Sequence, residues 1–153
     1  MNHAAHDSLR DALLATRPEP AGIRFRTSDN RVVEFSAPTK FDSTLLPNCP
    51  GIYVALVRRA SLLNPGGFRF GPIYFGEAQI LCNRVVFGHH KFREWCRAAG
   101  GRSNLYLAYC KMRWSSKLAR KELETALMEY YESPCNEIRS VSLAARIASF
   151  GLP

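Results

Sequence analysis

The run GIYVALV at residues 51–57 decides the fold, because it is rich in β-branched and aromatic residues and follows the turn-forming stretch PNCP at 47–50. It therefore predicts a strand. The run GPIYFG at 71–76 is short, is bounded by Gly and Pro, and predicts a second strand. Residues 77–86 follow at once with helical composition and spacing. These three consecutive elements supply two tyrosines and an arginine: Tyr53, Tyr74 and Arg84.

Three further segments complete the expected core. Residues 104–110 form an alternating, largely apolar run that predicts a third strand, while 89–99 and 117–132 predict helices. The stretch Trp114-Ser115-Ser116 supplies the expected N-cap of the second of these helices, and Pro134 stops it. We therefore expect an α/β (α+β) fold with a small central antiparallel three-stranded sheet flanked by helices.

The chain on either side of this core is expected to extend it. Residues 4–16 predict an amphipathic helix, and residues 22–35 predict a β-hairpin with one packing face and one cationic face. We favour a lid on the core for the hairpin, because a two-stranded ribbon needs a surface to pack on, and a DNA contact is the alternative. A short helix is expected at 142–149. The expected boundaries are 1–48 for the N-terminal extension, 49–136 for the core, and 137–153 for the C-terminal helix and tail.

Length and composition indicate one domain. The chain has 153 residues, of which 46% are hydrophobic, and this is enough to bury a single core. No apolar run is long enough to cross a bilayer, and residues 1–7 lack the charged and apolar regions of a signal peptide. We therefore expect a soluble, cytoplasmic protein without a membrane partner.

The five cysteines are scattered and include no C-x-x-C pair, so we expect reduced thiols and no disulfide framework. One cluster of potential zinc ligands remains: Cys82, His89, His90 and Cys96. Its spacing matches no common zinc pattern. The expected alternative is buried thiols with solvent-facing histidines.

The charge distribution points to nucleic acid. The formal net charge is +8, and residues 84–121 contain ten basic residues and one acid, with aromatic residues interleaved. Arginine outnumbers lysine sixteen to five, which favours bidentate contacts to phosphate. A solvated face is the alternative. The residues expected to contact phosphate lie in residues 58–70, interpreted as a long loop, and in the basic segment: Arg58, Arg59, Arg69, Lys91, Arg93, Lys117 and Arg120.

The sequence resembles the GIY-YIG nuclease family over residues 49–136. Gly51-Ile52-Tyr53 matches the first half of the name, and Tyr74-Phe75-Gly76 matches the second with Phe in place of Ile. Arg84 falls where the family places its catalytic arginine on the next helix. The family's last motif, a glutamate followed by an apolar pair, a proline and an asparagine, corresponds to Glu124, Leu127-Met128, Pro134 and Asn136.

The resemblance implies the roles of the site residues. Tyr53 would act as the base or position the attacking water, and Tyr74 would hydrogen-bond in the same site. Arg84 would clamp the scissile phosphate. Glu124 would bind one divalent ion, Mg²⁺ or Mn²⁺. Asn136 would tie the end of the Glu124 helix to the site and is counted among the nucleic-acid-binding residues.

One position departs from the family. Many members have His or Tyr one helical turn after the arginine, where this chain has Gly88. His89, the next residue, is therefore a further catalytic candidate. If His89 does not take part, the assignment of the base depends on Tyr53 alone.

The expected function is that of a metal-dependent endonuclease that hydrolyses DNA, with the site on a sheet face formed by Tyr53, Tyr74, Arg84 and Glu124. Members of the family are expected to leave 3′-hydroxyl and 5′-phosphate ends. Two alternatives stay open, namely a non-cleaving nucleic-acid-binding module on the same fold and a ribonuclease toxin that acts on RNA. The sequence leaves open the target sequence, the preference for single or double strands, the biological role and the oligomeric state.

Overall fold

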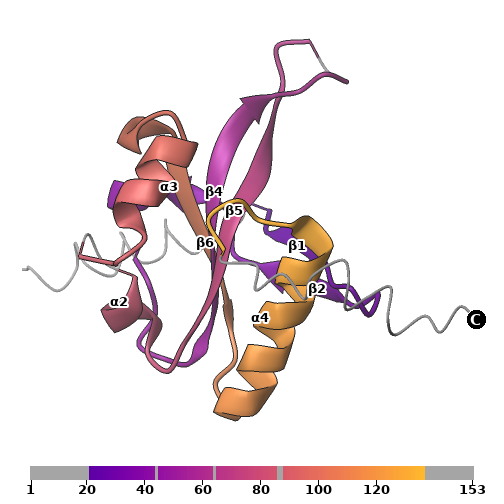
Figure 1. Cartoon of the computed structure of the whole chain (residues 1–153), viewed down its shortest axis with the longest axis vertical. Helices are drawn as coiled ribbons and strands as arrows, with labels where there is room; N and C mark the ends of the chain where they lie inside the picture. The colour runs from indigo at the N-terminus through magenta and orange to yellow at the C-terminus, as the bar shows by residue number, and fades with distance from the viewer. Residues whose placement is uncertain (1–20, 44, 64, 86–87, 137–153) are drawn as a thin grey trace, which may run out of the picture.

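The computed structural model describes residues 21–43, 45–63, 65–85 and 88–136. It has a mixed α and β architecture with antiparallel sheets (Figure 1), and the expected class is confirmed at this level. One sheet has the strand order β3-β6-β4-β5, and β1 and β2 form a separate hairpin. The strands are β1 (Ile23–Arg26), β2 (Val32–Phe35), β3 (Thr39–Lys40), β4 (Gly51–Ala60), β5 (Phe68–Ala78) and β6 (Leu105–Lys111). The helices are α2 (Leu81–Arg84), α3 (Phe92–Ala98) and α4 (Lys117–Tyr131), with short 3-10 turns at Phe41–Ser43 and Arg102–Asn104.

The three expected strands are β4, β5 and β6, and the two-residue strand β3 adds a fourth at the outer edge of β6. Strand β4 lies between β6 and β5, and its residues 51–57 are all buried. Its side chains alternate between the two faces of the sheet, as the period of a strand requires. A central strand that is covered on both faces needs a continuous apolar run, which explains the sequence at 51–57.

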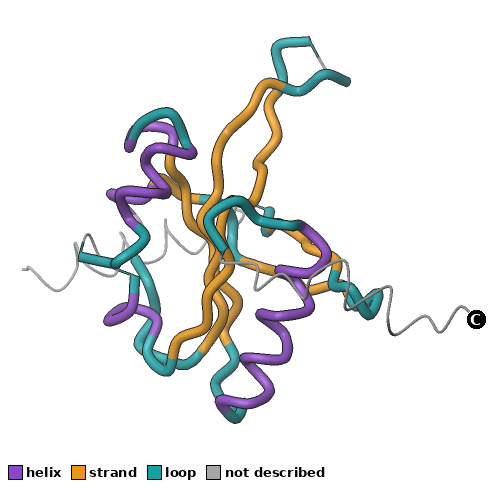
Figure 2. Tube along the Cα trace, viewed as in Figure 1, coloured by secondary structure: helices purple, strands orange, loops and turns teal. Residues whose placement is uncertain are grey.

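The two faces of the sheet are covered differently. Tyr53, Ala55 and Val57 pack with Leu81 of α2 and Trp95 of α3 in one hydrophobic cluster. The other face carries a second cluster, which includes Ile52, Val54 and Leu56 of β4, Leu123 and Leu127 of α4, and Phe25 and Phe35 of the hairpin. Figure 2 shows α2 and α3 on one side of the strands and α4 on the other.

The β1–β2 hairpin packs against the second face. The ring of Phe25 lies edge-on to those of Phe75 and Tyr131, with centroids 5.4 and 5.3 Å apart. The backbone N–H of Ser28 donates to Ala126 O of α4 at 2.9 Å, and that of Ser36 donates to Tyr109 O of β6 at 2.8 Å. The hairpin therefore covers the core, while Arg24 and Arg26 face solvent.

Strands β4 and β5 are longer than expected and leave the body of the molecule together as a two-stranded ribbon (Figure 1). Arg58, Arg59 and Arg69 lie in the paired strands, with Arg59 opposite Arg69. The interpretation of 58–70 as a long loop is therefore wrong. The polar side chains are compatible with strand structure here because Arg58–Ala60, Phe68 and Arg69 are exposed rather than covered by a helix.

The segment after β5 also differs from the expectation. Residues 77–86 were expected to be helical, but β5 continues to Ala78 and α2 has only four residues. Ala78 pairs with Gly51 of β4, so tertiary pairing overrides the local helical preference. The expected helices at 4–16 and 142–149 lie outside the described residues. No helix among the described residues is long and apolar enough to cross a membrane.

Candidate active site

A pocket of about 370 Å³ lies at the outer edge of β5. Tyr53 and Tyr74 reach it from the face covered by α2 and α3, whereas Glu77 and Glu124 belong to the side of α4. Arg84 of α2 and Lys121 of α4 complete its charged lining. The sequence prediction placed Tyr53, Tyr74, Arg84 and Glu124 on one sheet face. The structure instead gathers them around the edge strand, where side chains from both faces meet.

The edge strand has backbone groups that no neighbouring strand pairs, and two of the expected site residues bind them. The side-chain amide of Asn136 accepts from Phe75 N and donates to Phe75 O, both at 2.8 Å. Glu124 Oε1 accepts from Glu77 N at 3.2 Å. Unpaired strand edges are stabilised by such contacts. Asn136 is thus occupied in docking the end of the chain after α4 onto β5, rather than being available to nucleic acid.

Both motif glycines are required by close packing. A Cβ atom at Gly76 would overlap with Cζ and Oη of Tyr53, because the tyrosine ring lies directly across Gly76 on the paired strand. A Cβ atom at Gly51 would overlap with the carbonyl oxygen of Cys110 on β6. Glycine at 76 therefore lets the Tyr53 ring pass over β5 toward the pocket.

We expect Gly76→Ala to destabilise the protein by about 1–3 kcal/mol, because the added Cβ atom would overlap the buried Tyr53 ring and force it out of its packed position. Chemical denaturation of the variant and the wild type measures this difference. Gly88→Ala is the matched control, because a Cβ atom at Gly88 would have no neighbour within 4 Å. Equal stability of the two variants would contradict the packing argument.

His89 is buried next to Tyr53, in contrast to the expectation of solvent-facing histidines. Its Nε2 lies 3.0 Å from Tyr53 Oη, and its Nδ1 accepts from Lys91 N at 3.1 Å. Burial, and then the positive charges of His90, Arg84 and Lys91, lower the pKa of His89 to about 4. The neutral ring that accepts at Nδ1 must carry its proton on Nε2. His89 therefore donates to Tyr53 and cannot take its proton.

The two tyrosines form a polarised pair, with ring centroids 5.9 Å apart. Burial raises the pKa of Tyr53 far above its usual value, and the hydrogen bond to Tyr74 raises it further. Burial also raises the pKa of Tyr74, but the same hydrogen bond lowers it, as expected when Tyr53 is the donor. The charge and hydrogen bond of Arg84 lower the pKa of Tyr53, but burial outweighs them, so Tyr53 is a neutral phenol and its burial opposes the role of a base.

The acids of the pocket are held by two cations of α4. Lys121 Nζ lies 2.7 Å from Glu124 Oε2 and 3.9 Å from Glu77 Oε1. Arg120 Nε lies 3.2 Å from Glu77 Oε2. Burial alone lowers the pKa of Lys121, but the hydrogen bond to Glu124 and the charges of both acids outweigh it, so the pKa is raised and the ammonium stays charged.

This donor set fits a hard divalent cation. One positive charge, the Lys121 ammonium, already lies against both Glu124 and Glu77. Mg²⁺ and Mn²⁺ bind one or two carboxylates and keep several waters. No group of three or more His, Cys, Asp and Glu side chains in the described part of the chain could hold a metal ion, so Cys82, His89, His90 and Cys96 form no such cluster. A divalent ion here would be bound by Glu124, Glu77 and water in place of the ammonium.

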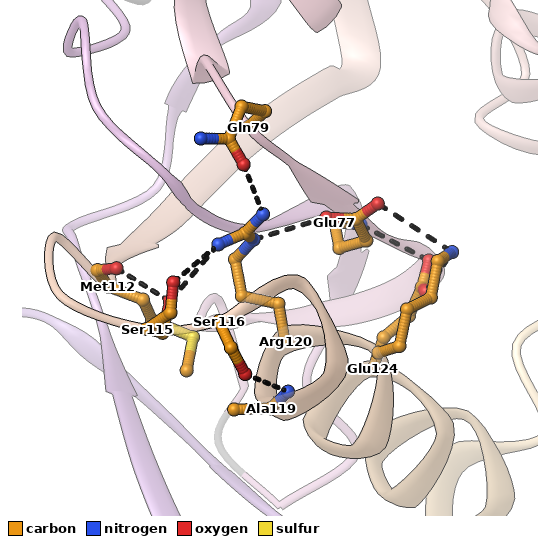
Figure 3. Close-up of polar contacts among 9 residues, drawn as sticks. Glu77, Gln79, Met112, Ser115, Ser116, Ala119, Arg120 and Glu124 are labelled. Atoms are coloured by element: carbon orange, nitrogen blue, oxygen red, sulfur yellow. Dashed lines mark hydrogen bonds and ion pairs between the residues drawn. The ribbon is translucent and has the colours of Figure 1, made fainter.

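The residues expected to contact phosphate differ in how far they are exposed. Those that are exposed are Arg58, Arg59, Arg69, Arg93 and Lys117. Lys91 is only partly exposed and pairs with Glu94 at 2.9 Å. Arg120 is 1% exposed, so the prediction that it contacts nucleic acid at the surface is wrong. Its guanidinium binds Glu77, Gln79 and Ser115 (Figure 3).

Glu77 and Lys121 line the pocket but were not among the expected site residues. Glu77 was assigned to a helix, where its side chain had no defined direction. Its position in β5, three residues after Tyr74, is the signal that identifies it once the strand is known to continue. Lys121 was one of ten basic residues in its segment, and only the contact with Glu124 distinguishes it.

No protein-family model matches the chain, and neither a curated protein nor a solved structure matches it. The class of site must therefore be defined by its own chemistry. It combines acids that suit a hard cation with an exposed arginine and two phenols around one pocket. Such a site can bind an anion and a cation together.

Proposed function

We propose that this protein is a metal-dependent endonuclease that hydrolyses phosphodiester bonds in DNA, with a GIY-YIG-like arrangement of its sheet and site. The observation that carries the proposal is the convergence of Tyr53, Tyr74, Arg84 and Glu124 on a single pocket. These four residues come from four different elements between residues 51 and 131.

The lining residues have complementary roles in the proposed reaction. Arg84, which is exposed at the pocket, would bind the scissile phosphate. Glu124 and Glu77 would hold the divalent ion, which supplies charge neutralisation at the phosphate and lowers the pKa of a bound water. Tyr74 is the more accessible of the two phenols, at 8% exposure against 0% for Tyr53, and would hydrogen-bond to the substrate or the attacking water.

Tyr53 and His89 would position Tyr74 rather than exchange protons with the substrate. The chain of hydrogen bonds runs from His89 Nε2 to Tyr53 Oη and from Tyr53 to Tyr74. Because Tyr74 accepts from Tyr53, its own proton is directed elsewhere, and the pocket offers Glu124 and solvent. This arrangement supports a role for Tyr53 in positioning Tyr74 over the role of a base.

A cleavage assay tests the proposal. The full chain is incubated with supercoiled plasmid, labelled single-stranded DNA and labelled RNA, in Mg²⁺, in Mn²⁺ and in EDTA. We expect cutting of DNA that requires the metal. Cutting of RNA alone would favour a ribonuclease, and binding of all three substrates without cutting would favour the binding module.

One observation favours the binding module as the second candidate. Lys121 and Arg120 already balance the charges of Glu124 and Glu77, so the two acids need no divalent ion for charge neutralisation. A non-cleaving module would keep these ion pairs and use Arg84 and the ribbon for binding. The response of the assay to Mg²⁺ separates the two functions.

The β4–β5 ribbon supports an extended nucleic-acid contact. A second pocket of about 560 Å³ lies along the ribbon and is lined by Lys40, Arg58, Arg59 and Tyr106, among others. The Arg58 guanidinium lies 3.8 Å from the centroid of the Phe68 ring, which fixes its direction. From Glu77 to Arg69, the strand spans roughly 26 Å at 3.3 Å per residue. At 3.4 Å per nucleotide, the ribbon and the first pocket would contact sites about eight nucleotides apart.

We expect Arg59→Gln and Arg69→Gln each to reduce the salt dependence of DNA binding by about one unit of slope in log K against log[salt], because each would remove one phosphate contact. Titrations at several salt concentrations in EDTA measure the slopes. Arg24→Gln is the matched control, since Arg24 is exposed on β1 and paired with Glu34. Unchanged slopes for both ribbon variants would contradict a phosphate contact there.

A further inference from the structure

The turn between β6 and α4 carries a large aromatic ring that packs on nothing. Trp114 is 98% exposed, whereas the other tryptophan, Trp95, is fully buried. A tryptophan offers more apolar surface than most side chains, and exposing it to water is unfavourable unless a partner covers it. An exposed tryptophan by itself does not say which partner this is.

The turn is rigid and is tied to the candidate active site. Ser115 N and Ser115 Oγ both donate to Met112 O, at 3.1 and 2.6 Å. Ser116 Oγ accepts from Ala119 N at 3.1 Å and so caps α4, as expected from the sequence. The backbone on both sides of Trp114 is therefore fixed before any ligand binds.

Arg120 connects this turn to the pocket. Its Nη1 donates to Ser115 O at 2.9 Å, and its Nη2 donates to Gln79 Oε1 at 2.6 Å. Gln79 lines the pocket that contains Glu124. Ser115, the residue after Trp114, is thus connected to Gln79 at the rim of the pocket through the buried guanidinium of Arg120, as Figure 3 shows.

The charges around the Trp114 ring indicate the chemical class of the partner that would cover it. Exposed cations flank Trp114 on its turn and at the adjoining ends of β6 and α4: Lys111, Arg113 and Lys117. An exposed aromatic ring among cations is the combination by which proteins bind single-stranded nucleic acid, with phosphates on the cations and a base stacked on the ring. We propose that Trp114 is a stacking platform for an unpaired base of the strand that enters the pocket. This inference depends on the proposed function and adds to it a preference for an unpaired nucleotide beside the cleaved bond.

The test uses binding rather than cleavage. The full chain is titrated in EDTA with a twelve-residue oligothymidylate and, separately, with an abasic oligonucleotide of the same length, while tryptophan emission is recorded. We expect thymidylate to quench the emission strongly and the abasic strand to quench it little. Because the chain has only two tryptophans and Trp95 is buried, Trp114→Phe should abolish the quenching.

Affinity gives the second readout. We expect Trp114→Ala to weaken thymidylate binding by about 5- to 150-fold, the range measured for one base on one aromatic ring, and to leave abasic binding unchanged. Leu118→Ala is the matched control, because Leu118 is an exposed apolar residue nearby and should not affect either strand.

Other results would overturn the inference. If the wild type and Trp114→Ala bind thymidylate equally, or if the variant loses the same affinity for both strands, Trp114 does not stack on a base. The proposed endonuclease function would be unaffected by either result. Emission changes with anionic vesicles but not with thymidylate would assign Trp114 to a lipid surface. Absence of binding to either strand, together with no cleavage, would overturn the stacking platform and the proposed function together.

Discussion

Glu124→Gln is expected to lower the rate of metal-dependent cleavage by about 10²- to 10³-fold or more, because it removes the charge that would hold the divalent ion. Glutamine has the same shape as glutamate, and its Oε1 can still accept the hydrogen bond from Glu77 N that fixes the edge of β5. The fold should therefore persist. Single-turnover cleavage in Mg²⁺, together with thermal unfolding of the same sample, measures the two effects separately.

Glu122→Gln is the matched control for this prediction. Glu122 lies on the same helix as Glu124 but is exposed and outside the pocket lining, so its substitution makes the same change in net charge without altering the site. We expect wild-type cleavage from this variant. If Glu124→Gln cleaves as fast as Glu122→Gln, Glu124 does not bind the ion, and the catalytic assignment of the pocket is wrong.

The sheet was predictable from sequence because its signal is local. The continuous apolar run at 51–57 and the alternation at 104–110 are the two sequence patterns that predict strands, and each needs information only from adjacent residues. The exposed continuation of β4 and β5 was missed for the same reason. Beyond residue 57 the ribbon leaves the core, so charged residues such as Arg58 and Arg59 no longer conflict with strand structure.

The burial of Arg120 was not predictable, since it depends on partners far along the chain. Helical periodicity places Arg120 beside the apolar stripe, where an arginine is normally exposed. It is buried because Glu77, 43 residues earlier, and Gln79, 41 residues earlier, provide acceptors for its guanidinium. Similarly, the burial of His89 depends on its stacking with Trp95, at 4.4 Å between ring centroids, and on the hydroxyl of Tyr53.

For the motif residues, the shared location was predictable from the sequence, but the contacts of each side chain were not. The resemblance of their motifs to the GIY-YIG family implied that Tyr53, Tyr74, Arg84 and Glu124 would share a site, and all four line one pocket. The resemblance could not predict that Glu124 would bind the backbone of the edge strand, or that Tyr53 would donate to Tyr74. Burial and the interaction with Tyr74 raise the pKa of Tyr53, and so the role of Tyr53 changes from base to positioning group in the proposed mechanism.

Arg120→Met is expected to destabilise the protein by about 3–5 kcal/mol, because it leaves the Glu77 carboxylate mostly buried without its main partner. At about 2–4 °C per kcal/mol for a chain of this size, the melting temperature should fall by roughly 6–20 °C. The melting temperature of Arg120→Lys should lie between those of Arg120→Met and the wild type. A single ammonium cannot replace the three separate contacts of the guanidinium.

A double-mutant cycle with Glu77→Gln shows whether the loss comes from the unpaired charge. Neutralising Glu77 in the Arg120→Met background should recover part of the lost stability, with a coupling energy of about 0.5–3 kcal/mol. Additive losses would mean that Arg120 stabilises the fold mainly through Ser115 and Gln79, that is, by fixing the Trp114 turn to the pocket rim. A loss of less than about 1 kcal/mol in the free energy of unfolding of Arg120→Met would contradict both accounts. So small a loss is typical of a guanidinium in solvent and not of one buried between its acceptors.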